Sequence, residues 1–204
     1  MKVIYKDYVK KQKGGGCSLE SDNLLWRNGQ IRFIKKMFGK LDRDKILLDI
    51  ACGDGVGLRQ FKKMSFKNVI GVEFNEVKAK LAKKIGYEVL KCDMHDLRKL
   101  DDKTFDVIYS SHTLEHAYDI GKVLKEFRRI LKSDGLLVVV LPYPDMHDFN
   151  REIHVAKHMI GLDKDNDGKS VVKFFENNGF LLKKKTYDYY REPEIWLEMT
   201  KVNV

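Results

Sequence analysis

The chain has 204 residues, of which 43% are hydrophobic and 34% are charged, and its formal net charge is +9. This length and composition suit one globular domain with a buried core, and no apolar run approaches the ~20 residues of a membrane-spanning helix. The N-terminal segment lacks the continuous apolar stretch of a secretory signal. Three widely spaced cysteines, Cys17, Cys52 and Cys92, argue against a disulfide framework and predict a cytoplasmic location.

The positive charge raises the question of a nucleic-acid partner, because clustered Lys and Arg neutralise phosphates. The basic residues are spread along the chain, and the densest run, residues 183–185, falls in a predicted strand. We therefore interpret the charge as a solvated surface, which disfavours nucleic acid and keeps it only as an alternative. The sequence does not indicate an oligomeric state.

The first half of the chain begins with a predicted helix at residues 22–38, whose apolar side chains fall on one face. Those side chains are Leu24, Leu25, Ile31, Ile34, Met37 and Phe38. From residue 45 onward, short apolar runs alternate with helical patterns, which is typical of βαβ units in a doubly wound sheet. The predicted strands are 45–51, 68–74, 87–93, 105–111 and 136–142, and the predicted helices are 58–64, 75–86 and 119–135.

The pattern loosens after residue 142. Residues 144–169 have little apolar periodicity, and a stretch of that length in a compact domain is usually functional or mobile. A helix follows at 170–180, with Ser170 as its expected N-cap and Gly179 as its stop. Two final strands, 180–190 and 194–202, are separated by few residues, so they are predicted to pair antiparallel.

A glycine-rich turn joins the first predicted strand of this region to the following helix. Its residues, Gly53-Asp54-Gly55-Val56-Gly57, let the backbone turn sharply and approach a ligand beside the free amides of a helix N-terminus. A nicotinamide-binding fingerprint would require one more small residue, and Leu58 stands in that place. The turn therefore predicts a cofactor other than NAD.

Acidic residues close the next two strands. Glu73 could accept hydrogen bonds from both hydroxyls of a ribose, as carboxylates do in dinucleotide sites. Asp93 could accept from an adenine amino group, with Met94 against the ring. Read singly, Glu73 could also be an exposed carboxylate and Asp93 a turn residue.

Taken in order, the segments LLDIACGDGVG, GVEFNE, CDMHDL, FDVIYSSHTLEH and EFRRILKSDGLLVVVLP make residues 44–143 resemble the class I S-adenosylmethionine (SAM)-dependent methyltransferases, especially those of quinone biosynthesis. The resemblance implies an α/β fold with a doubly wound, mostly parallel sheet of seven strands, the last antiparallel. It also implies SAM as the cofactor. The implied cofactor-binding residues are Asp49, Ala51, Gly53, Asp54, Gly55, Glu73, Phe74, Asp93, Met94, Ser110, Ser111 and His112.

We expect a single methyltransferase domain over residues 1–204, built from four parts. Residues 1–40 form a helical extension or lid, 44–143 the SAM-binding core, 144–169 a substrate loop, and 170–204 a helix with a strand pair. Tyr5, Tyr8 and Trp26 of the extension are candidates to close over the acceptor, because α/β folds bind substrates at the carboxyl ends of their strands.

A general base is needed only if the acceptor holds a proton, and histidine is the natural candidate near neutral pH. The candidates are His112, His154 and His158, with His147 in the same loop as the last two. If residues 152–160 are helical, His154 and His158 share one face. Alternatively, His154 and His158 are exposed histidines in a loop, or they form a paired-histidine metal site together with Asp145 or Asp148.

Two motifs resemble metal sites, and we interpret neither as one, so no metal is predicted. Residues 112–116 read H-x-x-E-H, but zinc chemistry there requires both histidines on one helix face and a third ligand. Residues 163–168 begin like a calcium loop, but Phe174 stands where the bidentate Glu belongs.

The sequence thus predicts a SAM-dependent methyltransferase that acts on a hydroxyl of a small molecule or a saccharide. No D/N-P-P-Y/F sequence follows residues 105–111, which disfavours methylation of DNA amino groups. The alternatives are an RNA- or protein-directed methyltransferase, a non-catalytic SAM-binding protein and an NAD-dependent oxidoreductase.

Overall fold

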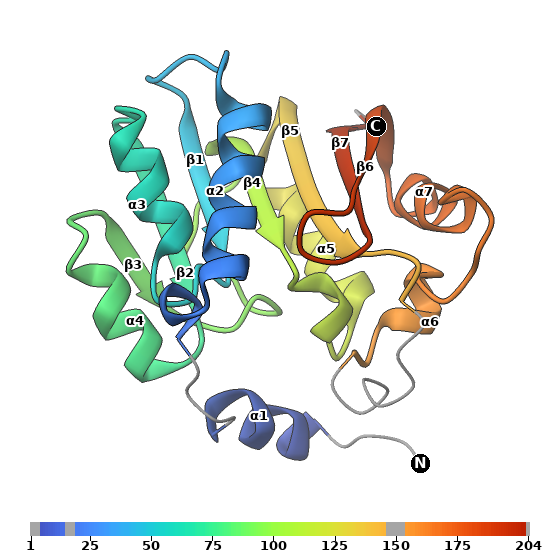
Figure 1. Cartoon of the computed structure of the whole chain (residues 1–204), viewed down its shortest axis with the longest axis horizontal. Coiled ribbons are helices and arrows are strands. Elements are labelled where there is room, and N and C mark those ends of the chain that lie inside the picture. Colours follow the sequence, from blue (N-terminus) through green and yellow to red (C-terminus); the bar gives the residue numbers. More distant parts are fainter. Residues whose placement is uncertain (1–4, 15–18, 146–153, 203–204) are drawn as a thin grey trace. The chain divides into compact units, whose positions relative to one another are not determined.

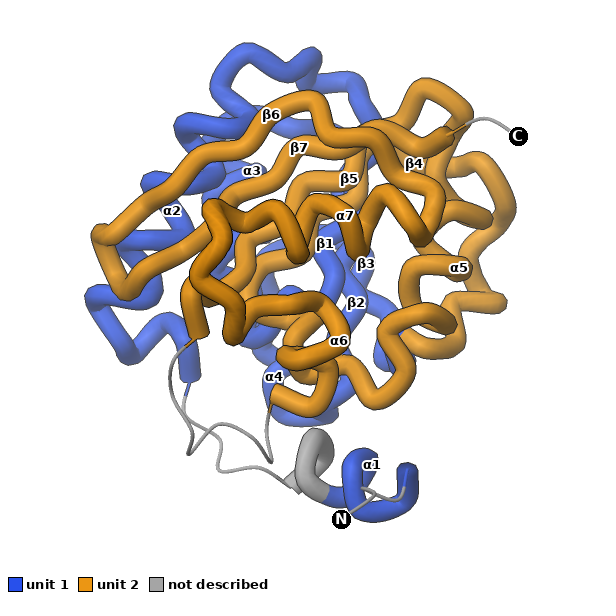
Figure 2. Tube along the Cα trace, turned by 90° about the vertical axis from the view of Figure 1, so that its right-hand side faces the viewer, with its two compact units in different colours: residues 1–94 blue, residues 95–204 orange. Residues whose placement is uncertain are grey.

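A computed structural model describes residues 5–14, 19–145 and 154–202 of the chain (Figure 1). The chain divides into two compact units, Met1–Met94 and His95–Val204 (Figure 2). Within the described ranges, the structure contains no helix with the length and apolar character needed to cross a membrane.

The first unit contains a parallel arrangement of three strands, in which β1 pairs with β2 and β2 pairs with β3. Helices α3 and α4 pack against β2, and α2 packs against α3. Its elements are α1 (Tyr5–Gly14), η1 (Glu20–Asp22), α2 (Leu24–Phe38), β1 (Ile46–Ile50), α3 (Val56–Lys63), β2 (Asn68–Glu73), α4 (Glu76–Lys83) and β3 (Glu88–Lys91).

Helix α2 buries only part of the predicted face. Ile34 and Phe38 are buried as predicted, whereas Leu24 and Leu25 are exposed, and Phe33, which lies outside the predicted face, is buried. The Phe38 ring lies 5.1 Å from the ring of Phe61 on α3. Because aromatic rings remove more apolar area from water than leucines do, the phenylalanines determine the buried face.

The second unit pairs β4 with β5 in parallel, and β7 lies antiparallel between β5 and β6. Helix α5 packs on β5 and α7 on β6. The elements are β4 (Phe105–Ser111), η2 (Leu114–His116), α5 (Ile120–Ile130), β5 (Leu131–Pro142), α6 (Lys157–Ile160), α7 (Lys169–Asn177), β6 (Phe180–Asp188) and β7 (Glu194–Lys201). The strand order is β3-β2-β1-β4-β5-β7-β6, which confirms the predicted fold class.

The predicted end of one helix and the predicted N-cap of another were wrong. The helix predicted to run to Gly135 ends at Ile130, because β5 starts at Leu131, which pairs with Phe105 of β4. The N-cap of α7 is Gly168, with φ at +65°, and not Ser170. Gly179, with φ at +82°, follows the C-terminus of α7 as predicted.

Candidate active site

The glycine turn follows β1 and leads directly into α3. Gly55 has φ at +91° and lies against Ala82 and Ile85 near the end of α4, a conformation that only glycine adopts without strain. A side chain at Gly53 would collide with the carboxylate of Glu20. Ala51 also has a positive φ, +53°, which is uncommon for a residue with a side chain. The turn therefore packs closely against other parts of the first unit at both glycines.

Asp49 is the strongest candidate for a ligand-binding residue in the first unit. Its side chain is 2% exposed, and its Oδ2 has no hydrogen-bond partner among the described residues. A Cβ added to Gly57 would lie 2.5 Å from this oxygen. Burial, followed by the charges of Glu20 and Glu73, raises the pKa of Asp49 well above its usual value. A buried acceptor without a donor beside a glycine turn fits the ammonium group in the methionine part of SAM.

The raised pKa of Asp49 predicts a pH-dependent stability. A carboxyl that keeps its proton in the fold stabilises the protein fully below its unfolded pKa, ~3.9, and this contribution is lost as pH rises through the higher folded pKa. Because a cationic partner favours the ionised carboxylate, we expect SAM to bind more tightly as pH rises. Asp49→Asn should flatten both dependences, measured by urea unfolding and calorimetry. Equal pH slopes in the two proteins would contradict the assignment.

Glu73 holds the glycine turn. Its Oε2 accepts a hydrogen bond from the Gly53 amide at 2.9 Å, and its Oε1 accepts one from the Asn75 amide at 2.6 Å. Burial raises its pKa, and these two bonds oppose the rise. Its role toward the ribose therefore stays a prediction, beside a structural role that the sequence did not reveal.

The sequence also missed Glu20. This residue begins η1, lies against Gly53, and pairs with Lys78 at 3.8 Å. Nothing local marks an acidic residue in a loop as part of a site, since its approach to the turn depends on how α2 packs. With Asp49 and Glu73, Glu20 brings three carboxyl groups to the turn, and a cationic ligand such as the sulfonium and ammonium of SAM would favour their ionised forms.

Asp93 meets the N-terminal helix of the same unit. The Tyr5 hydroxyl donates a hydrogen bond to Asp93 Oδ2 at 2.5 Å, and the Tyr5 and Tyr8 rings stack at 5.9 Å. Burial, then the charge of Asp93, raises the pKa of Tyr8, so the phenol stays neutral. The predicted extension therefore reaches the predicted adenine residue.

The remaining predicted cofactor residues of this unit lie close to the turn or follow a strand. Asp54 is buried and accepts a hydrogen bond from the Ser21 amide at 3.2 Å. Met94 is buried and Phe74 is half-buried. Trp26, a predicted lid residue, is half-buried in the first turn of α2.

In the second unit, the end of β4 presents Ser110, Ser111 and His112. The Ser110 hydroxyl is buried and has no hydrogen-bond partner among the described residues, whereas Ser111 is half-buried. His112 has φ at +47°, a strained backbone of the kind that clusters at functional sites.

Carboxylates surround the His112 ring. Its Nε2 lies 3.0 Å from Glu194 Oε1, and its Nδ1 lies 3.4 Å from Glu192 and 3.6 Å from Glu115. Burial lowers the pKa of His112, against the hydrogen bond with Glu194. The neutral ring therefore donates from Nε2 to Glu194, which leaves Nδ1 as the acceptor.

His154 is the second histidine held by a buried carboxylate. Its Nδ1 lies 2.7 Å from Asp145 Oδ2. His158 is exposed and pairs instead with Asp163. Helix α6 begins only at Lys157, so the condition that would put His154 and His158 on one helix face is not met. His147 and Asp148 lie outside the described residues.

The two metal-like motifs behave differently. The histidines of residues 112–116 separate: His112 joins Glu192 and Glu194, whereas Glu115 and His116 join His154. In the calcium-like segment, Asp167 pairs with Lys185 and accepts a hydrogen bond from the Tyr187 hydroxyl. That segment is a polar turn, as expected.

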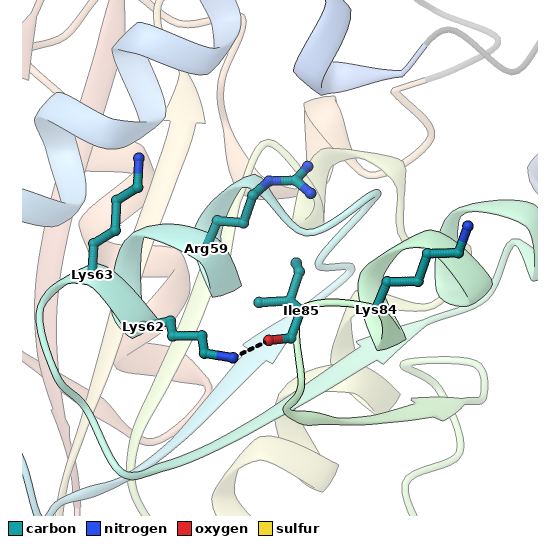
Figure 3. A pocket seen from close by; sticks show the side chains of 5 residues that line it. All are labelled: Arg59, Lys62, Lys63, Lys84 and Ile85. Carbon is teal, nitrogen blue, oxygen red and sulfur yellow. Dashed lines mark hydrogen bonds between the residues drawn. The ribbon is translucent and has the colours of Figure 1, made fainter.

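A separate hollow in the first unit is lined by basic side chains (Figure 3). Arg59, Lys62 and Lys63 come from α3, and Lys84 and Ile85 follow α4. Lys62 donates to the Ile85 carbonyl, and Arg59 to the Asp54 carbonyl. None of the predicted SAM residues lines this hollow, so we do not assign it to the cofactor.

Comparison with known proteins agrees with this geometry. Residues 48–139 match the family model described as "Methyltransferase domain". The chain is 25% identical to a ubiquinone/menaquinone biosynthesis C-methyltransferase of Campylobacter jejuni, over 58% of this chain and 52% of the relative. It is 31% identical to the ubiquinone biosynthesis O-methyltransferase of Pelagibacter ubique, over 46% of this chain and 40% of the relative. The chain spans about half the length of the curated relatives it matches.

Solved structures show the same fold. The [4+2]-cyclase SpnF has a TM-score of 0.70 at 14% identity, over 98% of this chain and 94% of that one. SAM-dependent methyltransferases are among the matching structures and curated relatives. The predicted resemblance is confirmed over residues 48–139, which match a methyltransferase domain, and the fold is that of the SAM-dependent methyltransferases among the matching structures.

Proposed function

We propose that the chain transfers the methyl group of SAM to a hydroxyl oxygen of a small molecule or a saccharide. SAM supplies an electrophilic methyl group on a sulfonium, and the products are the methyl ether, S-adenosylhomocysteine and a proton. In this proposal Asp49, Glu20 and the turn at residues 53–57 hold the methionine part. Glu73 takes the ribose, Asp93 and Met94 the adenine, and residues 110–112 line the cofactor.

The observation that carries the choice of acceptor is the pair of histidine–carboxylate dyads in the second unit. Glu194 orients His112, and Asp145 orients His154. A histidine fixed by a carboxylate is suited to accept a proton, and a hydroxyl acceptor has one to lose. We therefore retain His112 and His154 as candidate bases and set the exposed His158 aside.

Other functions rest on less. The basic hollow of Figure 3 is the feature that favours an RNA- or protein-directed enzyme, but two of its four cations are engaged by carbonyls of the chain. One relative is named as a C-methyltransferase, so methylation of a carbon atom is a second candidate reaction. Because a structure named as a [4+2]-cyclase has this fold, the fold alone does not decide the reaction. A cytoplasmic location remains part of the proposal, and the free, buried thiol of Cys52 is compatible with it.

We expect SAM and S-adenosylhomocysteine to raise the melting temperature, whereas NAD leaves it unchanged. A ligand at ~100 times its dissociation constant adds about 2.7 kcal/mol, a shift that differential scanning fluorimetry resolves. Asp49→Asn should reduce the shift, and Lys63→Ala, in the basic hollow, should not. A larger shift with NAD would point to an oxidoreductase.

Transfer of labelled methyl groups then separates the remaining functions. We expect label in the polyol, phenol or saccharide members of an acceptor panel, and none in RNA, protein or carbon acceptors. SAM binding without transfer to any class would favour a non-catalytic binding protein.

A further inference from the structure

A second cluster of chemically active side chains lies in the second unit. Glu115 and His116 belong to η2, and His154 precedes α6. One ligand atom from each lies within 4.8 Å of the other two. The His116 and His154 rings are 4.7 Å apart and nearly perpendicular, at 74°. Three donors from two segments thus converge at one point.

Glu115 is the member that requires an explanation. Its side chain is fully buried, and neither carboxylate oxygen has a hydrogen-bond partner among the described residues. Its nearest ionic neighbour is His112 Nδ1, at 3.6 Å. Burying a carboxyl without a partner costs free energy, so the fold retains this residue against its own stability. A bound cation would supply the missing partner.

The surroundings of His154 match those of a metal ligand. Its Nδ1 pairs with Asp145 at 2.7 Å, which directs Nε2 to the other side of the ring. Metal-binding histidines almost always use the second ring nitrogen in this way, toward a carboxylate or carbonyl that fixes the tautomer. The Ala156 amide donates to the Glu115 carbonyl at 2.9 Å, which holds the His154 segment beside η2.

We propose that Glu115, His116 and His154 bind one divalent transition-metal ion, with Asp145 orienting His154, and that this ion coordinates the acceptor hydroxyl. Two imidazoles and one carboxylate suit zinc, iron(II) or manganese better than magnesium. Three protein ligands leave coordination positions open for a substrate oxygen. A coordinated hydroxyl loses its proton at a lower pH than a free one, and because His154 is then a ligand, His112 is the base that takes the proton. The ion's catalytic role rests on the proposed function, whereas its binding does not.

The donors would have to close in on the ion. In a tetrahedral site, atoms about 2.1 Å from zinc are about 3.4 Å apart, so donors within 4.8 Å would approach one another by up to about 1.4 Å, which rotation of the side chains can supply. The neighbouring set, His112, Glu192 and Glu194, is less suitable. Its Glu194 already accepts hydrogen bonds from Arg191 and Trp196, and the Arg191 cation opposes a metal ion at the same oxygen.

Metal binding can be measured without SAM or an acceptor. Chelator-treated protein is titrated with Co²⁺ alone, followed by visible absorption, and the bound Co²⁺ is then displaced with Zn²⁺. We expect one ion per chain. Glu115→Gln and His116→Ala should each weaken binding at least 100-fold, and Asp145→Asn should weaken it 10–100-fold. His158→Ala, which removes a nearby histidine outside the cluster, should bind as the parent does.

Melting temperatures in chelator identify variants that fail to fold. Glu115→Gln keeps the volume of the side chain and removes a buried carboxyl, so it should be at least as stable as the parent. Absence of stoichiometric binding, or equal binding by the parent and the Glu115→Gln and His116→Ala variants, would overturn the site. Full methyl transfer in chelator would remove the catalytic role of the ion while leaving the proposed function intact. If the metal-loaded parent protein transferred no methyl group to any hydroxyl acceptor, the proposed function would be wrong while the metal site would stand.

Discussion

Replacing Gly57 by alanine is expected to weaken SAM binding by roughly 10- to 100-fold and to destabilise the fold by about 1–3 kcal/mol. The added Cβ would lie 2.5 Å from Asp49 Oδ2 and 3.4 Å from Gln30 Nε2. Both neighbours are buried, so the Asp49 carboxylate must turn away from the place proposed for the ammonium group of SAM. Calorimetric titration with SAM and urea unfolding measure the two effects.

Gly121→Ala is the matched control for this change. Gly121 is the second residue of α5, as Gly57 is of α3, and its added Cβ would meet Asp119 Oδ1 at an ordinary 3.5 Å. Alanine there should stabilise the protein by about 0.5–1 kcal/mol and leave SAM affinity unchanged. If Gly57→Ala bound SAM as tightly as the parent, Asp49 would not hold the cofactor.

Local patterns were enough to predict most of the sheet. Runs such as Ile46–Ile50, which is apolar except for Asp49, lack polar alternation because parallel strands are covered on both sides, and this requirement is visible in the sequence. Gly55 was predicted for the same kind of reason, because a positive φ restricts the residue type. These elements record constraints that act within a few residues.

The grouping of Glu20 with the glycine turn and the proposed metal-binding cluster could not be predicted, because they depend on contacts between distant residues. Glu20 meets Gly53 only through the packing of α2. Glu115 and His154 are 39 residues apart, and the bond between Ala156 and the Glu115 carbonyl brings their segments together. Spacing alone suggested instead that His154 and His158 act together, but α6 begins after His154.

Helix ends were predicted less well than helices. Glycine is a residue type that commonly follows a helix, and serine is a common N-cap, so Gly135 and Ser170 were predicted in these roles. Pairing of Leu131 with Phe105 instead ended α5 earlier, and Gly168 took the N-cap position of α7. In both cases a contact with another element outweighed the local preference.

Glu194→Ala is expected to have the largest effect on stability, a loss of about 3–5 kcal/mol, because it removes one partner of a buried ion pair. Glu194 is 1% exposed and accepts hydrogen bonds from Arg191 Nε, Trp196 Nε1 and His112 Nε2 at 2.7, 2.8 and 3.0 Å. The variant leaves all three donors without this acceptor and leaves the guanidinium of Arg191 without this buried counter-charge. Urea unfolding with an unchanged m-value measures the loss.

The pH dependence identifies the cause of that loss. Burial raises the pKa of Glu194, but the hydrogen bond from His112 and the charge of Arg191 outweigh it and hold the pKa at about 2. The stabilisation is therefore present above the unfolded value, ~4.3, and disappears as pH falls toward 2. Parent and Glu194→Ala should converge in stability over that range. Glu198→Ala, on the same strand with Lys184 at 3.7 Å, should cost less than about 1 kcal/mol at any pH. If both variants lost stability to a similar extent, the loss would come from shortening any side chain on β7. The ionic contacts of Glu194 with Arg191 and His112 would then not be its cause.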